Sequence, residues 1–169
     1  MKYTIEDTFD VSAAHYWSVF FSDEFNRELW PALDITCEPL SLERTGEGDA
    51  LEIRREQRLT PRREVPAIIQ KFVKGGFSYV EKNHFKAREN LMRTVTVPSF
   101  MAEKIETHGI YRLEPLGENR VKRVWEGTLE CSIALIGGKI EKLLVDEVRE
   151  SYRKATDFTR AWHAKHPAG

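Results

Sequence analysis

Several polar and charged side chains stand at positions where strand alternation otherwise puts apolar residues. In the segments 49–60, 77–87, 90–97 and 119–132, every second residue is mostly apolar, which is typical of strands with one buried face. The polar exceptions on these faces are Arg55, Gln57, Glu81, Asn83, Arg93 and Arg123. Burial of a lone charge is costly, so these groups must pair, reach water or lie at strand ends.

Three interpretations of these groups stay open. Apolar walls with a few convergent polar groups are what a small-molecule site requires, which favours a binding pocket. Alternatively, an arginine near a sheet end can extend into solvent, and Arg93 can form a structural ion pair with Glu81. Glu81 together with Tyr79, Asn83 or Arg93 could also act as a general acid and base.

The sequence carries no pattern typical of a metal, cofactor or nucleophile site. The five histidines are scattered, and HExxH, GxSxG, Walker and GxGxxG patterns are absent. Cys37 and Cys131 lie far apart among apolar residues and have no CxxC partner, which indicates two buried thiols. We therefore predict no cofactor and no bound metal, and we assign no catalytic residue.

Arginines gather beside a predicted short helix. The stretch 54–64 contains five arginines and two glutamates, and it leads into 65–74, where Pro66 suits a first helical turn and Lys74 and Gly75 suit an end. Such a segment could form a gate that contacts anionic membrane lipid transiently and lifts to admit a ligand. The alternatives are a solvated hairpin end followed by a helix packed on the core, or a strand over the same residues.

The remaining elements follow from periodicity and end signals. Residues 3–11 alternate as a strand, Ser12 can cap a helix, and Ser22 or Asp23 can cap a second helix that Pro31 stops. Six further strands are predicted at 33–44, 49–60, 77–87, 90–97, 103–115 and 119–132, and a long amphipathic helix at 138–163. One helix is too narrow to cover a seven-stranded sheet. We therefore expect a strongly curved sheet around the long helix, with space between the two.

Length and charge limit the class of protein. The 169 residues predict one domain over 1–169, and 26 Lys+Arg against 27 Asp+Glu leave a net charge of −1. That balance argues against a nucleic-acid partner bound through bulk positive charge. No run approaches the ~18 apolar residues of a membrane span, and the first residues lack the apolar core of a signal peptide, so we expect a cytoplasmic protein.

Two stretches carry a family resemblance. Residues 9–23, a strand that runs into a helix, and residues 137–162, the long helix, resemble the START-like superfamily, also called SRPBCC, which includes the birch-pollen-allergen-like proteins. The first stretch is also similar to VASt-type sterol-binding domains, and the second to uncharacterised bacterial members. The resemblance implies an α+β helix-grip fold: a seven-stranded curved antiparallel sheet around a long C-terminal helix, with two short helices after strand 1 and a short inserted helix.

The resemblance also implies a function. Helix-grip proteins hold hydrophobic or amphipathic ligands between sheet and helix, so we expect binding, or transport, of a small molecule such as a lipid or sterol-like compound. The expected lining is Tyr79, Phe85, Trp125, Leu144, Val148 and Tyr152, with Arg55, Glu81 and Arg93 at a polar end. The alternatives are a polyketide-cyclase- or hydrolase-like enzyme that uses the same cavity, and a co-chaperone-like interaction module with a filled core.

Overall fold

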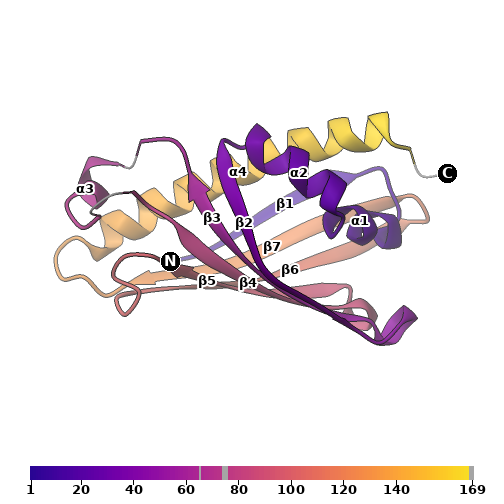
Figure 1. The fold of residues 1–169 in the computed structure, drawn as a ribbon, viewed down its shortest axis with the longest axis horizontal. Coiled ribbons are helices and arrows are strands. Elements are labelled where there is room, and N and C mark those ends of the chain that lie inside the picture. The colour runs from indigo at the N-terminus through magenta and orange to yellow at the C-terminus, as the bar shows by residue number, and fades with distance from the viewer. Residues whose placement is uncertain (65, 74–75, 168–169) are drawn as a thin grey trace.

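A curved antiparallel sheet makes up most of the fold. The computed structural model describes residues 1–64, 66–73 and 76–167, and within them seven strands pair in the order β1-β7-β6-β5-β4-β3-β2. The strands are β1 (Lys2–Phe9), β2 (Ile35–Thr45), β3 (Glu52–Pro61), β4 (Tyr79–Lys86), β5 (Leu91–Pro98), β6 (Ile105–Gly117) and β7 (Arg120–Cys131). Figure 1 shows the helix α4 (Gly137–Lys165) lying along the concave side of this sheet. The predicted helix-grip architecture is confirmed.

Two capped helices follow the first strand, as the sequence predicted. The Ser12 hydroxyl accepts a hydrogen bond from the backbone N–H of His15 (3.2 Å) at the start of α1 (Ala13–Phe20). Ser22 does the same for α2 (Asp23–Ala32). The second helix includes Pro31 in its last turn and ends one residue beyond the predicted stop.

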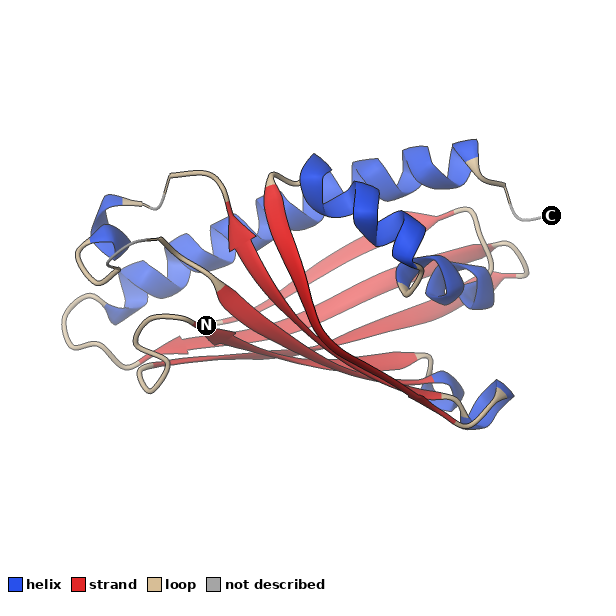
Figure 2. Ribbon diagram, in the orientation of Figure 1, coloured by secondary structure: helices blue, strands red, loops and turns tan. Residues whose placement is uncertain are grey.

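Shorter helices lie at the two ends of the space between the sheet and α4. Phe25 of α2 contacts Phe158 and Trp162 of α4, with ring centroids 5.7 and 5.5 Å apart. At the other end, α3 (Ala67–Gln70) buries Ile69 in a cluster with Ile140 of α4. Figure 2 shows that the α-helices lie over the concave side of the sheet and leave its convex side uncovered.

The inserted helix α3 is shorter than its predicted span. It covers four of the residues 65–74, and its turns are tightened by an i→i+3 bond from the Ile69 N–H to the Pro66 carbonyl (2.8 Å). Val65, Lys74 and Gly75, at the ends of the predicted helix, lie outside the described residues. Such a short helix is stabilised mainly by packing, here through the buried side chain of Ile69.

The predicted inward face of β5 is wrong. The side chain of Arg93 is 52% exposed and pairs with Glu89 at 3.4 Å on the convex face, whereas Met92 is buried. The preceding 3-10 turn η2 (Ala87–Glu89) ends on Asn90 in the left-handed conformation (φ 47°), which sets the phase of the strand. Met92 therefore lies opposite buried Phe85, and the inward positions of the strand are Met92, Thr94, Thr96 and Pro98.

The predicted inward faces of the other three segments are confirmed. Arg55 and Gln57 of β3, Asn83 of β4 and Arg123 of β7 are all buried. Among the described residues, no helix combines the length and apolar composition needed to cross a bilayer.

Candidate functional site

A cavity of about 260 Å³ lies between the concave face of the sheet, α4 and the shorter helices. Its volume is just below the ~300–1,000 Å³ of most small-molecule sites. Aromatic and aliphatic side chains share its walls; the aromatic ones are Tyr3, Tyr16, Phe20, Phe25, Trp30, Phe77, Tyr79, Phe100, Tyr111, Trp125 and Tyr152. The space between sheet and helix is therefore lined, but not filled, by side chains.

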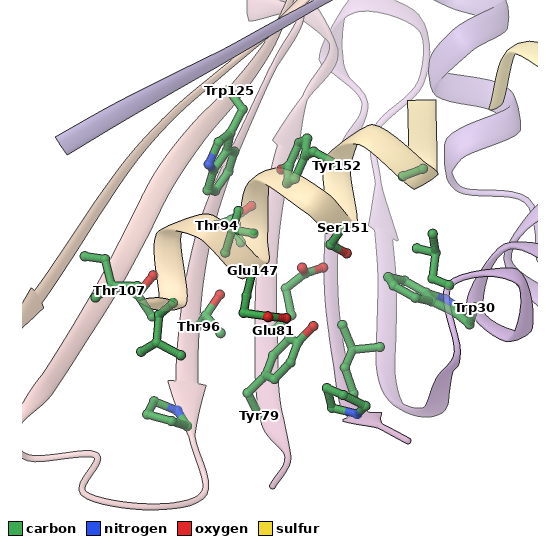
Figure 3. A pocket seen from close by; sticks show the side chains of 18 of the residues that line it. Trp30, Tyr79, Glu81, Thr94, Thr96, Thr107, Trp125, Glu147, Ser151 and Tyr152 are labelled. Carbon is green, nitrogen blue, oxygen red and sulfur yellow. The ribbon is translucent and has the colours of Figure 1, made fainter. Parts of the chain in front are cut away.

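Most of the site residues expected from the sequence border this cavity. Those that line it are Arg55, Tyr79, Glu81, Trp125, Leu144, Val148 and Tyr152. Figure 3 shows Tyr79, Glu81, Trp125 and Tyr152 converging from the sheet and from α4.

Two of the expected residues lie elsewhere. Phe85 belongs to the packed core under α1, where its ring centroid lies 4.6 Å from that of Trp17 and 5.3 Å from that of Phe21. Its inward orientation was predicted correctly, but α1 covers it and separates it from the cavity. Arg93 points away from the cavity because Met92, and not Arg93, lies on the inward face of β5, so its expected place at the polar end is wrong, and the alternative of an ion pair with Glu81 is also excluded.

A hydrogen-bonded network surrounds the carboxylate of Glu81. Its Oε1 accepts from Nε2 of Gln57 (3.0 Å) and from Nδ2 of Asn83 (2.7 Å). The Thr94 hydroxyl in turn donates to Oδ1 of Asn83 (2.8 Å), which fixes the orientation of that amide. Side chains of β3 and β4 thus hold Glu81 through its Oε1 alone. The side chain of Glu81 lines the cavity and is 22% exposed.

Arg55 is the cation nearest to Glu81, yet it is loosely paired. Its Nη2 lies 3.9 Å from Oε1 of Glu81, and its Nη1 donates to Oδ1 of Asn26 at 3.5 Å. The guanidinium stacks near the rings of Phe20 and Phe21, at 5.0 and 5.1 Å from their centroids, and its Nε has no hydrogen-bond partner. Burial lowers the pKa of Arg55, and the charge of Glu81 opposes that effect.

A second buried arginine lies among tyrosines at the end of the cavity near β1. Arg123 pairs with Asp7, donates to the Thr156 hydroxyl (2.6 Å) and lies 4.9 Å from the ring centroid of Tyr152. The hydroxyl of Tyr111 is hydrogen-bonded to that of Tyr16. Burial raises the pKa of both Tyr111 and Tyr152, so these hydroxyls are neutral near pH 7.

The cavity reaches the surface beside α3. Arg63, in the segment after β3, pairs with Glu147 of α4 at 2.7 Å, and both side chains line the cavity. Of the other arginines in the basic stretch, Arg55 also lines the cavity, whereas Arg54 is exposed on the convex face and Arg58 pairs there with Glu38. The stretch therefore forms no single basic surface, because alternation sends successive arginines to opposite faces of β3.

Several lining residues were missed in the sequence. The alternate residues Leu91, Val95 and Val97 are apolar, so the sequence favoured them for the inner face of β5 and left Thr94 and Thr96 for its outer face. The alternation of threonine with valine would indicate a polar wall only if it were known which of the two sets faces inward. Tyr16 recurs with Trp17, Phe20 and Phe21 at helical spacing, a pattern that does not separate a lining residue from a core residue.

Among the described residues, no cluster of three or more His, Cys, Asp or Glu side chains could hold a metal ion. His15 and His163 contact each other, with ring centroids 5.4 Å apart. Burial, and then the neighbouring His15, lower the pKa of His163 to about 4. Both imidazole nitrogens of His163 are buried without a hydrogen-bond partner, so its neutral form is favoured.

Three solved structures share the fold over almost the whole chain. The Zhui aromatase/cyclase from Streptomyces sp. R1128 has a TM-score of 0.67 and 11% identity, covering 100% of this chain and 96% of that one. Norcoclaurine synthase from Thalictrum flavum, in complex with dopamine and hydroxybenzaldehyde, has a TM-score of 0.61 and 14% identity, with coverages of 100% and 89%. A START superfamily protein from Mycobacterium smegmatis has a TM-score of 0.59 and 17% identity, with coverages of 91% and 92%. These similarities confirm the START-like fold.

Sequence comparisons agree on the extent of the match. A family model described as a protein of unknown function, DUF2505, matches residues 4–162. No curated protein matches the sequence significantly.

Proposed function

The chain belongs to the DUF2505 family, and from its cavity we propose that it binds a small hydrophobic or amphipathic molecule between the sheet and α4. The observation that carries the proposal is a largely apolar cavity whose wall includes Glu81 and Arg55, with Gln57 and Asn83 holding Glu81 from behind that wall. Apolar walls supply affinity, and a few oriented polar groups supply specificity.

An aromatic ligand fits this cavity better than a long-chain lipid. The volume of about 260 Å³ suits a compact molecule. Aromatic walls stack favourably with flat rings, and their tyrosine hydroxyls add polar contacts. Two proteins with the same fold support this choice: norcoclaurine synthase was solved with dopamine and hydroxybenzaldehyde, and the Zhui protein is an aromatase/cyclase. A sterol-like compound or lipid remains the alternative ligand in the same site.

Catalysis in the same cavity is the second candidate function. It is favoured by one observation: among the described residues, Oε2 of Glu81 accepts no hydrogen bond, so it is available to a substrate proton. In a cyclase- or hydrolase-like reaction, Glu81→Gln would abolish turnover and leave affinity for the substrate largely intact. Unchanged turnover would remove Glu81 from that mechanism.

An interaction module is the third candidate, since the cavity of about 260 Å³ lies just below the ~300 Å³ at which most small-molecule sites begin. We also propose a cytoplasmic location, because Cys37 and Cys131 are both free thiols, as is usual in a reducing compartment.

Native mass spectrometry tests the proposed binding. Protein purified under mild conditions is measured before and after organic extraction, and the extracted protein is then mixed with 2-naphthol. We expect a bound molecule of defined mass, or uptake of one equivalent of 2-naphthol. Val148→Trp, which fills the cavity from α4, should block uptake. Val95→Trp makes the same change on the convex face, where Val95 is 48% exposed, and should not. Protein that stays empty throughout would contradict the proposal.

A further inference from the structure

We infer that the polar centre of the cavity recognises an uncharged ligand group that both donates and accepts a hydrogen bond, as a primary carboxamide does. The inference rests on the proposed function, and it specifies the polar part of the ligand. It follows from the hydrogen-bonding capacity that Glu81 and Arg55 leave unused.

Glu81 offers an acceptor. Gln57 and Asn83 both donate to its Oε1, and Arg55 is also closest to that oxygen. Among the described residues, no group donates to Oε2, although the side chain lines the cavity and is 22% exposed there. A carboxylate oxygen binds a donor strongly, because such a hydrogen bond is assisted by charge.

Arg55 offers donors beside that acceptor. A guanidinium has five N–H donors, and this one is only 9% exposed. Its hydrogen bond to Asn26 is long, at 3.5 Å, its distance to Glu81 is 3.9 Å, and its Nε has no partner. Buried donors without acceptors are costly, and a ligand oxygen that accepts from Arg55 would remove that cost.

The charges of the site select an uncharged group. Arg55 and Glu81 compensate each other, and at the mouth Arg63 is compensated by Glu147. An anionic ligand would bring a second negative charge close to Glu81, and a cationic ligand would bring a second positive charge close to Arg55. Like charges at this distance in a buried site repel strongly, whereas an uncharged donor–acceptor group satisfies both side chains.

Three probes with one ring system separate the possible ligand groups. They are 2-naphthamide, which donates and accepts; methyl 2-naphthoate, which only accepts; and 2-naphthoate, which accepts and is anionic. Binding is measured by isothermal titration calorimetry. We expect the amide to bind about tenfold more tightly than either other probe, since one charge-assisted hydrogen bond distinguishes it.

Variants test whether Glu81 causes that preference. In Glu81→Gln the side-chain oxygen can accept from Gln57 and Asn83, so an amide N–H₂ faces the ligand in place of Oε2. We expect the preference for the amide over the ester to fall below threefold. Glu56→Gln makes the same substitution on the convex face, where Glu56 pairs with Lys82, and should keep the preference. Thermal unfolding verifies that both variants fold.

The possible outcomes separate the two proposals. Tighter binding of the amide that is lost in Glu81→Gln supports the inference. Equal binding of the three probes, strongest binding of 2-naphthoate, or a preference unchanged in Glu81→Gln would overturn the inference and leave the proposed function standing. Failure of all three probes to bind the wild type would overturn the inference, and it would overturn the proposed function as well if the protein also stays empty in native mass spectrometry.

Discussion

Removal of Asp7 should destabilise the protein far more than removal of an exposed carboxylate. Asp7 is the carboxylate paired with Arg123, whose side chain is 2% exposed and lies among the rings of Phe9, Tyr111 and Tyr152. In Asp7→Ala the guanidinium would keep its hydrogen bond to Thr156 but lose its counter-charge. An uncompensated buried charge typically costs about 3–5 kcal/mol.

That free energy converts into a measurable shift in melting temperature. For a protein of this size, about 1 kcal/mol shifts the midpoint of thermal unfolding by roughly 2–4 °C, so Asp7→Ala should lower it by about 6–20 °C. Glu38→Ala, which removes the exposed partner of Arg58, should cost below ~1 kcal/mol. Arg123→Met should lower the free energy of unfolding less than Asp7→Ala does. Its unpaired partner, Asp7, has a side chain that is 19% exposed, so water can solvate that carboxylate. Calorimetry of the three variants gives the ranking, and an Asp7→Ala shift no larger than that of Glu38→Ala would refute the reasoning.

Three further perturbations probe other parts of the structure. The pKa of His163 in the folded protein is about 4, below its ordinary 6.5, so the unfolded chain binds the proton at a higher pH than the folded protein does. The free energy of unfolding should therefore fall as pH drops from about 6.5 to about 4. In urea titrations, His163→Phe should flatten this pH dependence. A Cβ at Gly109 would lie 2.4 Å from the ring of Trp125, so Gly109→Ala should displace that ring. The displacement should change the fluorescence of the protein and weaken binding of 2-naphthol. Unchanged fluorescence and affinity would argue against this contact. Arg63→Ala removes the ion pair with Glu147 at the mouth of the cavity and should change the free energy of unfolding by less than ~1 kcal/mol. The same variant should release its ligand faster in stopped-flow fluorescence. Equal dissociation rates for the variant and the wild type would contradict this prediction.

The overall fold could be predicted from the sequence because its signals are local. Serine caps at Ser12 and Ser22, alternation in β3 and β7, and the long stripe of α4 each follow from short-range physical chemistry. Helix ends were less predictable. Pro31 is tolerated in the last turn of α2, and α3, whose Ile69 packs in a buried cluster, covers only four residues.

The phase of β5 could not be predicted from its own residues. Leu91, Val95 and Val97 favour the parity that includes Arg93, but the register is set by the turn at Asn90 and by pairing with β4. Apolar side chains on the convex face mimic an inward face when the strand is considered alone. The threonines that face the cavity were missed for the same reason.

The polar centre was predictable in part. Arg55, Gln57, Glu81 and Asn83 stand out because each interrupts an apolar face. Their connections could not be predicted, since the bonds from Gln57 and Asn83 to one oxygen of Glu81 depend on strand register. The role of Tyr111 was equally hidden, because a buried tyrosine in a strand has the same pattern whether it packs or lines a cavity.

A crystal structure of the protein with 2-naphthamide would show whether the cavity binds a ligand and how. We expect one ordered naphthyl ring between the sheet and α4, with the amide nitrogen within hydrogen-bond distance of Oε2 of Glu81 and the amide oxygen facing Arg55. A cavity closed by side chains, or a ligand found only on the outer surface at saturating concentration, would contradict this expectation.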